Sequence, residues 1–185
     1  MKYRKLWTDM HSNIHHEQMK KLPLWYGHIK KLMDFWPVAY YPFYMRPTES
    51  GLAVEDRYKN ELVAEDWEII REFTKNANAE GFPMFMGYEW QGAGLDGDHN
   101  VFFLNNDGEQ KHPLRYKELV QVFQGEKVIG IPHHLAYQPG SRGKNWDTHD
   151  DQFSPLAEIY SSHGSSENDD GPLGMNRHIH MGLHC

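Results

Sequence analysis

The chain has 185 residues, of which 39% are hydrophobic and 14% aromatic, and its formal net charge is −7. This length fits one domain spanning residues 1–185, and the aromatic content excludes a disordered chain. The negative charge argues against nucleic-acid binding through a basic surface, and no apolar run is long enough to cross a membrane. The N-terminus lacks the apolar stretch of a secretory signal, and the single cysteine, Cys185, allows no internal disulfide. We therefore expect a cytoplasmic location.

The hydrophobic pattern predicts strands and helices that alternate along the chain. Helices are expected over 16–35, where Pro23 introduces a kink, over 54–78 and over 113–124. Strands are expected over 3–9, 35–44, 81–90, 100–106, 127–134 and 154–164. Alternation of this kind favours an α/β fold with a mainly parallel sheet, arranged in layers or as a barrel.

Histidine is unusually frequent, with 13 residues of this type. Because imidazole is the commonest transition-metal ligand in proteins, such grouping suggests metal binding. A metal site needs only about three to six protein ligands, so roughly half of the histidines are expected to be ordinary surface residues. Most of them fall into three groups: His11, His15 and His16; His133 and His134; and His178, His180 and His184.

Four predicted apolar strands run into a histidine or a glutamate at their carboxyl ends, namely His11, Glu89, His133 and His163. The carboxyl ends of parallel strands converge on one face, where ligands bind. Imidazole combined with carboxylate suits Zn, Mn or Fe, and two such ions can clamp both oxygens of an ester. Of the neighbouring His133 and His134, we expect one to face the site and favour His133.

The segments DMHSN, GYEW followed by GDHNVFF, IPHHLAY and EIYSSHGSSE together resemble the PHP (polymerase and histidinol phosphatase) superfamily, closest to its branch of PHP-like metal-dependent hydrolases. The resemblance runs along nearly the whole chain. It implies a distorted TIM-like β/α barrel that hydrolyses phosphate esters with two or three divalent ions (Zn, Mn or Fe) at the barrel mouth. The metal ligands that it implies are Asp9, His11, Glu89, His99, His133 and His163.

The same interpretation assigns catalytic roles to His15, His16 and Arg142. One of the two histidines would protonate the leaving group, and the arginine would neutralise developing negative charge. The expected substrate is a small-molecule or sugar-linked anionic ester. The alternative interpretations are a polar helix start for the histidines and a solvated loop for Arg142.

Departures from the family pattern support a second hypothesis. Asn13 stands where the family has a second histidine, and Tyr41 lies where a Thr-Asp-His strand end is expected. The family's final Asp-x-His strand is expected after HIHMGLHC, so we expect a barrel that is incomplete at its C-terminus. A catalytically silent metal-binding or interaction domain therefore stays open, and an unclosed barrel would expose strand edges through which copies could self-associate.

Overall fold

The computed structural model of the chain describes residues 3–49, 51, 53–92, 94–135, 137, 142–161 and 163–167. The described residues form two compact units. Unit 1 contains the chain up to Tyr88 together with Phe102–Gly108, and unit 2 contains Glu89–Val101 and the residues from Glu109 onward. The boundary between the units therefore crosses two strands.

The main sheet is mixed, and its five strands in the described part of the chain are hydrogen-bonded in the order β1-β2-β5-β6-β7. Within unit 1, β1 and β2 are parallel with Ser12 opposite Val38, and β2 and β5 are parallel with Trp36 opposite Met84. The strands are β1 (Ser12–Ile14), β2 (Trp36–Tyr40), β5 (Met84–Trp90), β6 (His99–Phe103) and β7 (Val128–Pro132).

The prediction of a TIM-like β/α barrel of PHP type, incomplete at its C-terminus, is wrong. The sheet is an open row of strands rather than a closed barrel, and the described ranges contain three α-helices. A β/α barrel places a helix after every one of its parallel strands. Here β5 and β6 are joined only by residues 91–98, whereas a parallel connection needs a dozen residues or more.

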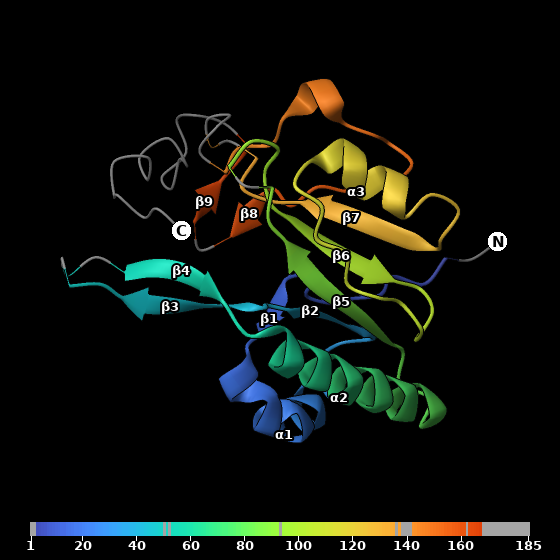
Figure 1. Cartoon of the computed structure of the whole chain (residues 1–185). Helices are drawn as coiled ribbons and strands as arrows, with labels where there is room; N and C mark the ends of the chain where they lie inside the picture. Colours follow the sequence, from blue (N-terminus) through green and yellow to red (C-terminus); the bar gives the residue numbers. More distant parts are fainter. Residues whose placement is uncertain are drawn as a thin grey trace. The chain divides into compact units, whose positions relative to one another are not determined.

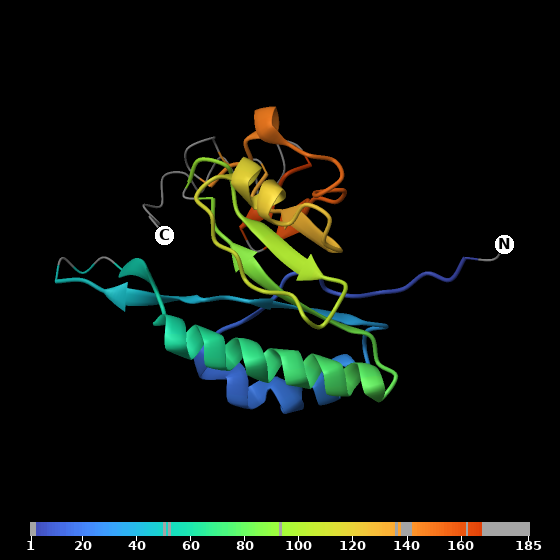
Figure 2. The same ribbon diagram turned by 45° about the vertical axis from the view of Figure 1, so that its right-hand side comes forward.

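Unit 1 carries helices η1 (His16–Lys21), α1 (Leu22–Ile29) and α2 (Asn60–Ala79). Figures 1 and 2 show α1 and α2 lying side by side, next to β2. The helix α2 buries a stripe at helical spacing that includes Val63, Trp67 and Ile70. An antiparallel ribbon of β3 (Phe43–Pro47) and β4 (Ala53–Arg57) follows β2.

Unit 2 contains α3 (Tyr116–Val122), η2 (Trp146–Thr148), and the short antiparallel pair β8 (Tyr160–Ser161) and β9 (Gly164–Ser165). Its aromatic core includes Tyr116, Phe123 and Phe153, all buried. Gly130 in β7 lies against Phe153, where an added Cβ would come within 2.4 Å of the ring. A side chain at this position would therefore displace the core aromatic.

Five predicted elements differ from the structure. The helix expected over 16–35 begins as the 3-10 helix η1 and ends at Ile29, and the strand expected over 35–44 is divided between β2 and the start of β3. Residues 3–9 form no strand, and the helix expected over 54–78 begins at Asn60 because Ala53–Arg57 pairs with β3 instead. Within the range 154–164, where a strand was expected, the described residues are mostly irregular, and strand structure is limited among them to β8 and the first residue of β9. The helical and strand assignments between 81 and 134 are confirmed within a few residues.

Candidate metal centre

Unit 2 brings together polar side chains from the ends of three strands. Glu89 lies near the end of β5, Asp98 immediately precedes β6, and His133 and His134 directly follow β7. The backbone amide of His133 donates a hydrogen bond to the carbonyl oxygen of Asp98 at 3.1 Å, which holds the two loops together. None of the four residues is more than 3% exposed. We refer to Glu89, Asp98, His133 and His134 as the Asp98 cluster.

The ligand atoms of the Asp98 cluster lie at distances that suit a metal ion. One carboxylate oxygen of Asp98 and one ring nitrogen each of His133 and His134 lie within 4.8 Å of one another. Glu89 Oε1 lies 3.4 Å from His133 Nε2. Ligands bound to Zn²⁺ at about 2.0–2.2 Å lie roughly 3.3 Å apart in a tetrahedral site. Small side-chain adjustments would therefore bring the donors into coordination distance.

Two buried atoms of the cluster have no hydrogen-bond partner in the part of the chain that the structure describes, namely Asp98 Oδ2 and His134 Nδ1. Arg142 Nε forms an ion pair with Asp98 Oδ2 at 3.6 Å, which is longer than a hydrogen bond and offsets only part of the cost of burying this atom. Leaving a buried polar atom without a partner costs about 1–3 kcal/mol. A divalent cation would satisfy both atoms, and the mixed nitrogen and oxygen donors are those that Zn, Mn and Fe accept.

The electrostatic environment favours the ligand forms of these side chains. Burial raises the pKa of Asp98 to about 6, and Glu89 adds to this effect while His133 and Arg142 oppose it. Burial lowers the pKa of His134 to about 2, with His133, His163 and Arg142 acting in the same direction. At pH 7 the imidazole of His134 is neutral and Asp98 is mostly ionised, so each carries the lone pair that a metal requires.

The backbone is strained at two positions beside the cluster. His134 has φ of +57° and Arg142 has φ of +69°, both in the left-handed region. Residues other than glycine enter this region at a cost of about 1–3 kcal/mol and do so most often at functional sites. The strain at His134 turns its ring so that it contacts His133, with ring centroids 4.5 Å apart. The geometry therefore directs both neighbouring histidines to one cluster.

His163 lies next to the cluster rather than within it. Its ring contacts that of His134, with centroids 4.4 Å apart, and its Nδ1 lies 3.5 Å from the Tyr137 hydroxyl. Among the described residues, the groups of donors close enough to share an ion do not include His163. The structure thus places this predicted ligand beside His134, and its metal-binding role stays a prediction.

His99 has both ring nitrogens engaged. Its Nδ1 lies 3.1 Å from the carbonyl oxygen of Gly97, and its Nε2 lies 3.2 Å from Lys144 Nζ. The ring is fully buried and stacks on Tyr116 with centroids 4.8 Å apart. In this arrangement neither nitrogen is available to a metal, so we do not include His99 in the proposed ligand set.

The remaining predicted residues belong to unit 1. The carboxylate of Asp9 accepts hydrogen bonds from the His11 amide at 2.8 Å and from Ser12 Oγ at 3.2 Å, and so holds the turn before β1. The roles of Asp9 and His11 as ligands stay predictions.

The two histidines predicted to be catalytic have different surroundings within unit 1. His16 Nδ1 lies 2.8 Å from Oδ2 of the buried Asp66, which also accepts a hydrogen bond from the Tyr40 hydroxyl. His15 packs on Tyr41 with ring centroids 4.9 Å apart. The pairing of His16 with a buried carboxylate fixes which nitrogen carries the proton. Catalytic roles for His15 and His16 stay predictions.

Sequence reasoning missed Asp98 and chose only one of the adjacent histidines. Asp98 directly precedes His99, whose role as a ligand stays a prediction. His178, His180 and His184 lie outside the described residues.

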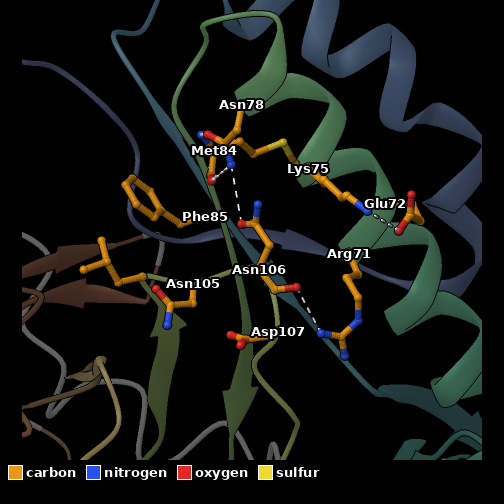
Figure 3. A pocket seen from close by; sticks show the side chains of 10 residues that line it. Arg71, Glu72, Lys75, Asn78, Met84, Phe85, Asn105, Asn106 and Asp107 are labelled. Atoms are coloured by element: carbon orange, nitrogen blue, oxygen red, sulfur yellow. Dashed lines mark hydrogen bonds and ion pairs between the residues drawn. The ribbon is translucent and has the colours of Figure 1, made fainter.

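An open cleft of about 590 Å³ lies elsewhere, in unit 1, and is shown in Figure 3. Its polar lining groups bind one another: Asn78 Nδ2 donates to the Met84 carbonyl oxygen, Arg71 donates to the Asn106 carbonyl oxygen, and Lys75 pairs with Glu72. Because its cations are already satisfied by protein oxygens, the cleft has no evident ligand.

Comparison with known proteins adds no assignment: no family model, no curated protein and no solved structure matches the chain. The resemblance to PHP-like hydrolases therefore stays a hypothesis based on short segments. In the described ranges, no helix is both long enough and apolar enough to cross a bilayer.

Proposed function

We propose that this protein is a metal-dependent hydrolase of phosphoric or related anionic esters, with its metal centre at the Asp98 cluster. The observation that supports the proposal is the convergence of the buried Asp98 carboxylate with two buried imidazoles, with Asp98 Oδ2 and His134 Nδ1 lacking hydrogen-bond partners in the described part of the chain. Such atoms are costly in an ordinary core. Metal binding gives them a physical reason to be there.

The residues of the cluster divide the work in a simple way. Asp98, His133 and His134 supply the donors that would hold a divalent ion of the Zn, Mn or Fe type, and Glu89, 3.4 Å from His133 Nε2, adds negative charge beside them. When bound, such an ion acts as a Lewis acid and lowers the pKa of a coordinated water. Arg142, beside Asp98, is positioned to bind an anionic ester oxygen and to neutralise charge that develops there.

A metal-binding domain without catalysis is the second candidate. The engagement of His99 by Gly97 and Lys144 favours it, because the ligand set is smaller than the one predicted from the sequence. The two candidates agree about metal binding and differ only about hydrolysis. They can therefore be separated in one set of measurements.

The test combines metal content with hydrolysis. The protein is first stripped of metal with a chelator and then reconstituted separately with Zn²⁺, Mn²⁺ and Fe²⁺. The bound metal is measured by elemental analysis. We expect at least one equivalent in the parent chain, with loss in Asp98→Asn and in His133→Gln. The variant His28→Gln serves as the matched control, because His28 lies in α1 of unit 1 and contributes to no ligand group in the described residues.

Hydrolysis is then measured with p-nitrophenyl phosphate and bis-p-nitrophenyl phosphate. Turnover that requires the metal and is lost in Asp98→Asn would support the hydrolase. Stoichiometric metal without turnover of either ester would favour the silent metal-binding domain. Absence of stoichiometric metal in the reconstituted parent would overturn both candidates.

A further inference from the structure

Lys144 is a buried lysine next to the candidate metal centre. Its side chain is only 2% exposed, although lysine is almost never fully buried unless it is paired. Unit 2 places it two residues after Arg142, in the segment that leads to η2. A buried ammonium needs compensation from its surroundings, so the groups around Lys144 Nζ indicate what it does.

The ammonium group is held by a neutral imidazole and an aromatic face. Nζ lies 3.2 Å from His99 Nε2 and 3.3 Å from the centroid of the Tyr116 ring. The carbonyl oxygen of Gly97 can only accept a hydrogen bond, so His99 Nδ1 carries the proton and Nε2 presents a lone pair to Lys144. A lone pair and a π face are both groups that attract a cation.

No carboxylate forms an ion pair with Lys144 in the described part of the chain. The nearby Asp96 already accepts hydrogen bonds from both Nε and Nη2 of Arg115, from Asn145 Nδ2 and from the Tyr116 amide. Burial lowers the pKa of Lys144 to about 8 while Asp96 opposes the shift, so the amine is still mostly protonated at pH 7. The positive charge therefore resides in a cage built around His99.

The cage is built from backbone as well as side chains. Gly97 has φ of +78°, and a Cβ added there would come within 2.8 Å of Lys144 Cα. The segment that carries Asp98 and His99 thus lies directly against the segment that carries Lys144.

We propose that the Lys144 ammonium is an internal cation that occupies the lone pair of His99 Nε2, so that His99 binds no metal and the centre takes one divalent ion per chain. This inference rests on the proposed metal-binding function. It assigns the ion to the Asp98 cluster alone. His99 then orients Lys144 instead of binding metal, and the fixed positive charge of Lys144 takes the place of a second ion beside the cluster.

The test is metal stoichiometry together with nitrogen NMR of the histidine rings, with Zn²⁺ alone as the probe. We expect one equivalent of Zn²⁺ in the parent chain and in His99→Gln, with the same affinity. In His133→Gln we expect affinity to fall more than ~100-fold, because a direct ligand is lost. In the parent, Zn²⁺ should shift the ring nitrogen signals of His133 and His134 and leave His99 Nε2 unchanged.

Two results would overturn the inference and leave the proposed function standing. The first is a shift of the His99 Nε2 signal to the position of a metal-bound nitrogen. The second is a second bound equivalent of Zn²⁺ that disappears in His99→Gln. The parent NMR spectrum answers the question even if His99→Gln does not fold. Zero equivalents in the parent would overturn the proposed function and this inference together. Lys144→Met provides the check on the pair itself, because removing the donor should shift His99 Nε2 while Nδ1 keeps its proton.

Discussion

The substitution Asp98→Asn should stabilise the metal-free protein at neutral pH. The folded-state pKa of Asp98 is raised from 3.8 to about 6, chiefly by burial. The unfolded chain therefore loses this proton at lower pH than the folded chain does. The contribution of Asp98 to folding stability is fully present below about pH 4, falls as pH rises to about 6, and stays constant above that pH. Asparagine does not titrate, so the variant escapes this loss.

The expected size follows from the shift. A difference of about two pKa units corresponds to ~3 kcal/mol, at 1.36 kcal/mol for each unit. The free energy of unfolding is measured by urea denaturation in EDTA from pH 4 to pH 8 for the parent and for Asp98→Asn. The change in their difference between pH 4 and pH 8 measures the titration of Asp98 together with its interactions with Glu89, His133 and Arg142.

Metal should reverse the order of stability. At a concentration of 1,000 times Kd, an ion that binds only the folded chain adds about 4.1 kcal/mol, which exceeds the ~3 kcal/mol advantage of the variant. The parent should gain this increment, and Asp98→Asn should gain little. A difference between parent and variant that does not change with pH in EDTA would refute the reasoning. So would a relative gain by the parent as pH rises.

Three further substitutions test the loops and units around the centre. Gly97→Ala should lower the free energy of unfolding by at least ~1–2 kcal/mol and weaken Zn²⁺ binding, because φ is +78° and the new Cβ would collide with Lys144. The control Gly27→Ala in α1 places a Cβ that meets nothing within 4 Å, so it should be neutral or stabilising in urea denaturation. Arg115→Ala should lower the urea midpoint at neutral pH. Burial of Asp96 opposes its ionisation, but hydrogen bonds from Arg115, Tyr116 and Asn145 lower its pKa from 3.8 to about 2. The loss of stability in Arg115→Ala should therefore shrink as pH falls from 4 to 2, and a loss that stays the same would contradict this assignment. Asp66→Asn should lower the free energy of thermal unfolding by about 1–3 kcal/mol, because the buried carboxylate accepts hydrogen bonds from both His16 and Tyr40. The control is Glu65→Gln on the exposed side of α2, and equal losses in the two variants would show that the pairing has no special role.

Much of the fold was predictable because its signals are local. The helix α2 repeats apolar residues at helical spacing, and β5 and β7 are apolar runs bounded by glycine or proline. The ribbon of β3 and β4 could not be predicted in this way, because it is stabilised by pairing between two segments and residues 54–57 have the acidic composition of a helix start. The absence of a barrel was partly readable: the link over 91–98 is too short for a parallel crossover.

The candidate centre was predictable only where a strand end fixes the side chain. Glu89 and His133 follow from the rule that polar residues at the ends of apolar strands gather on one face. His134 did not follow, because successive side chains of an extended strand point to opposite faces. Its left-handed backbone breaks this alternation, and composition carries no sign of that conformation. Asp98 was missed because the adjacent His99 offered the more familiar ligand, and only packing shows that His99 is paired with Lys144.

The features of the Asp98 cluster are unfavourable one by one, and this is the strongest reason to regard it as functional. A carboxyl group with a pKa of about 6 and a left-handed histidine each cost free energy in the metal-free chain. Asp98 Oδ2 and His134 Nδ1, without hydrogen-bond partners in the described ranges, add to that cost. Asp96, a few residues away, shows that the same fold can satisfy a buried carboxylate completely, with Arg115, Asn145 and the Tyr116 amide as partners. Since the costs are concentrated at donors that can share one ion, metal binding accounts for them together, whereas a purely structural role accounts for none.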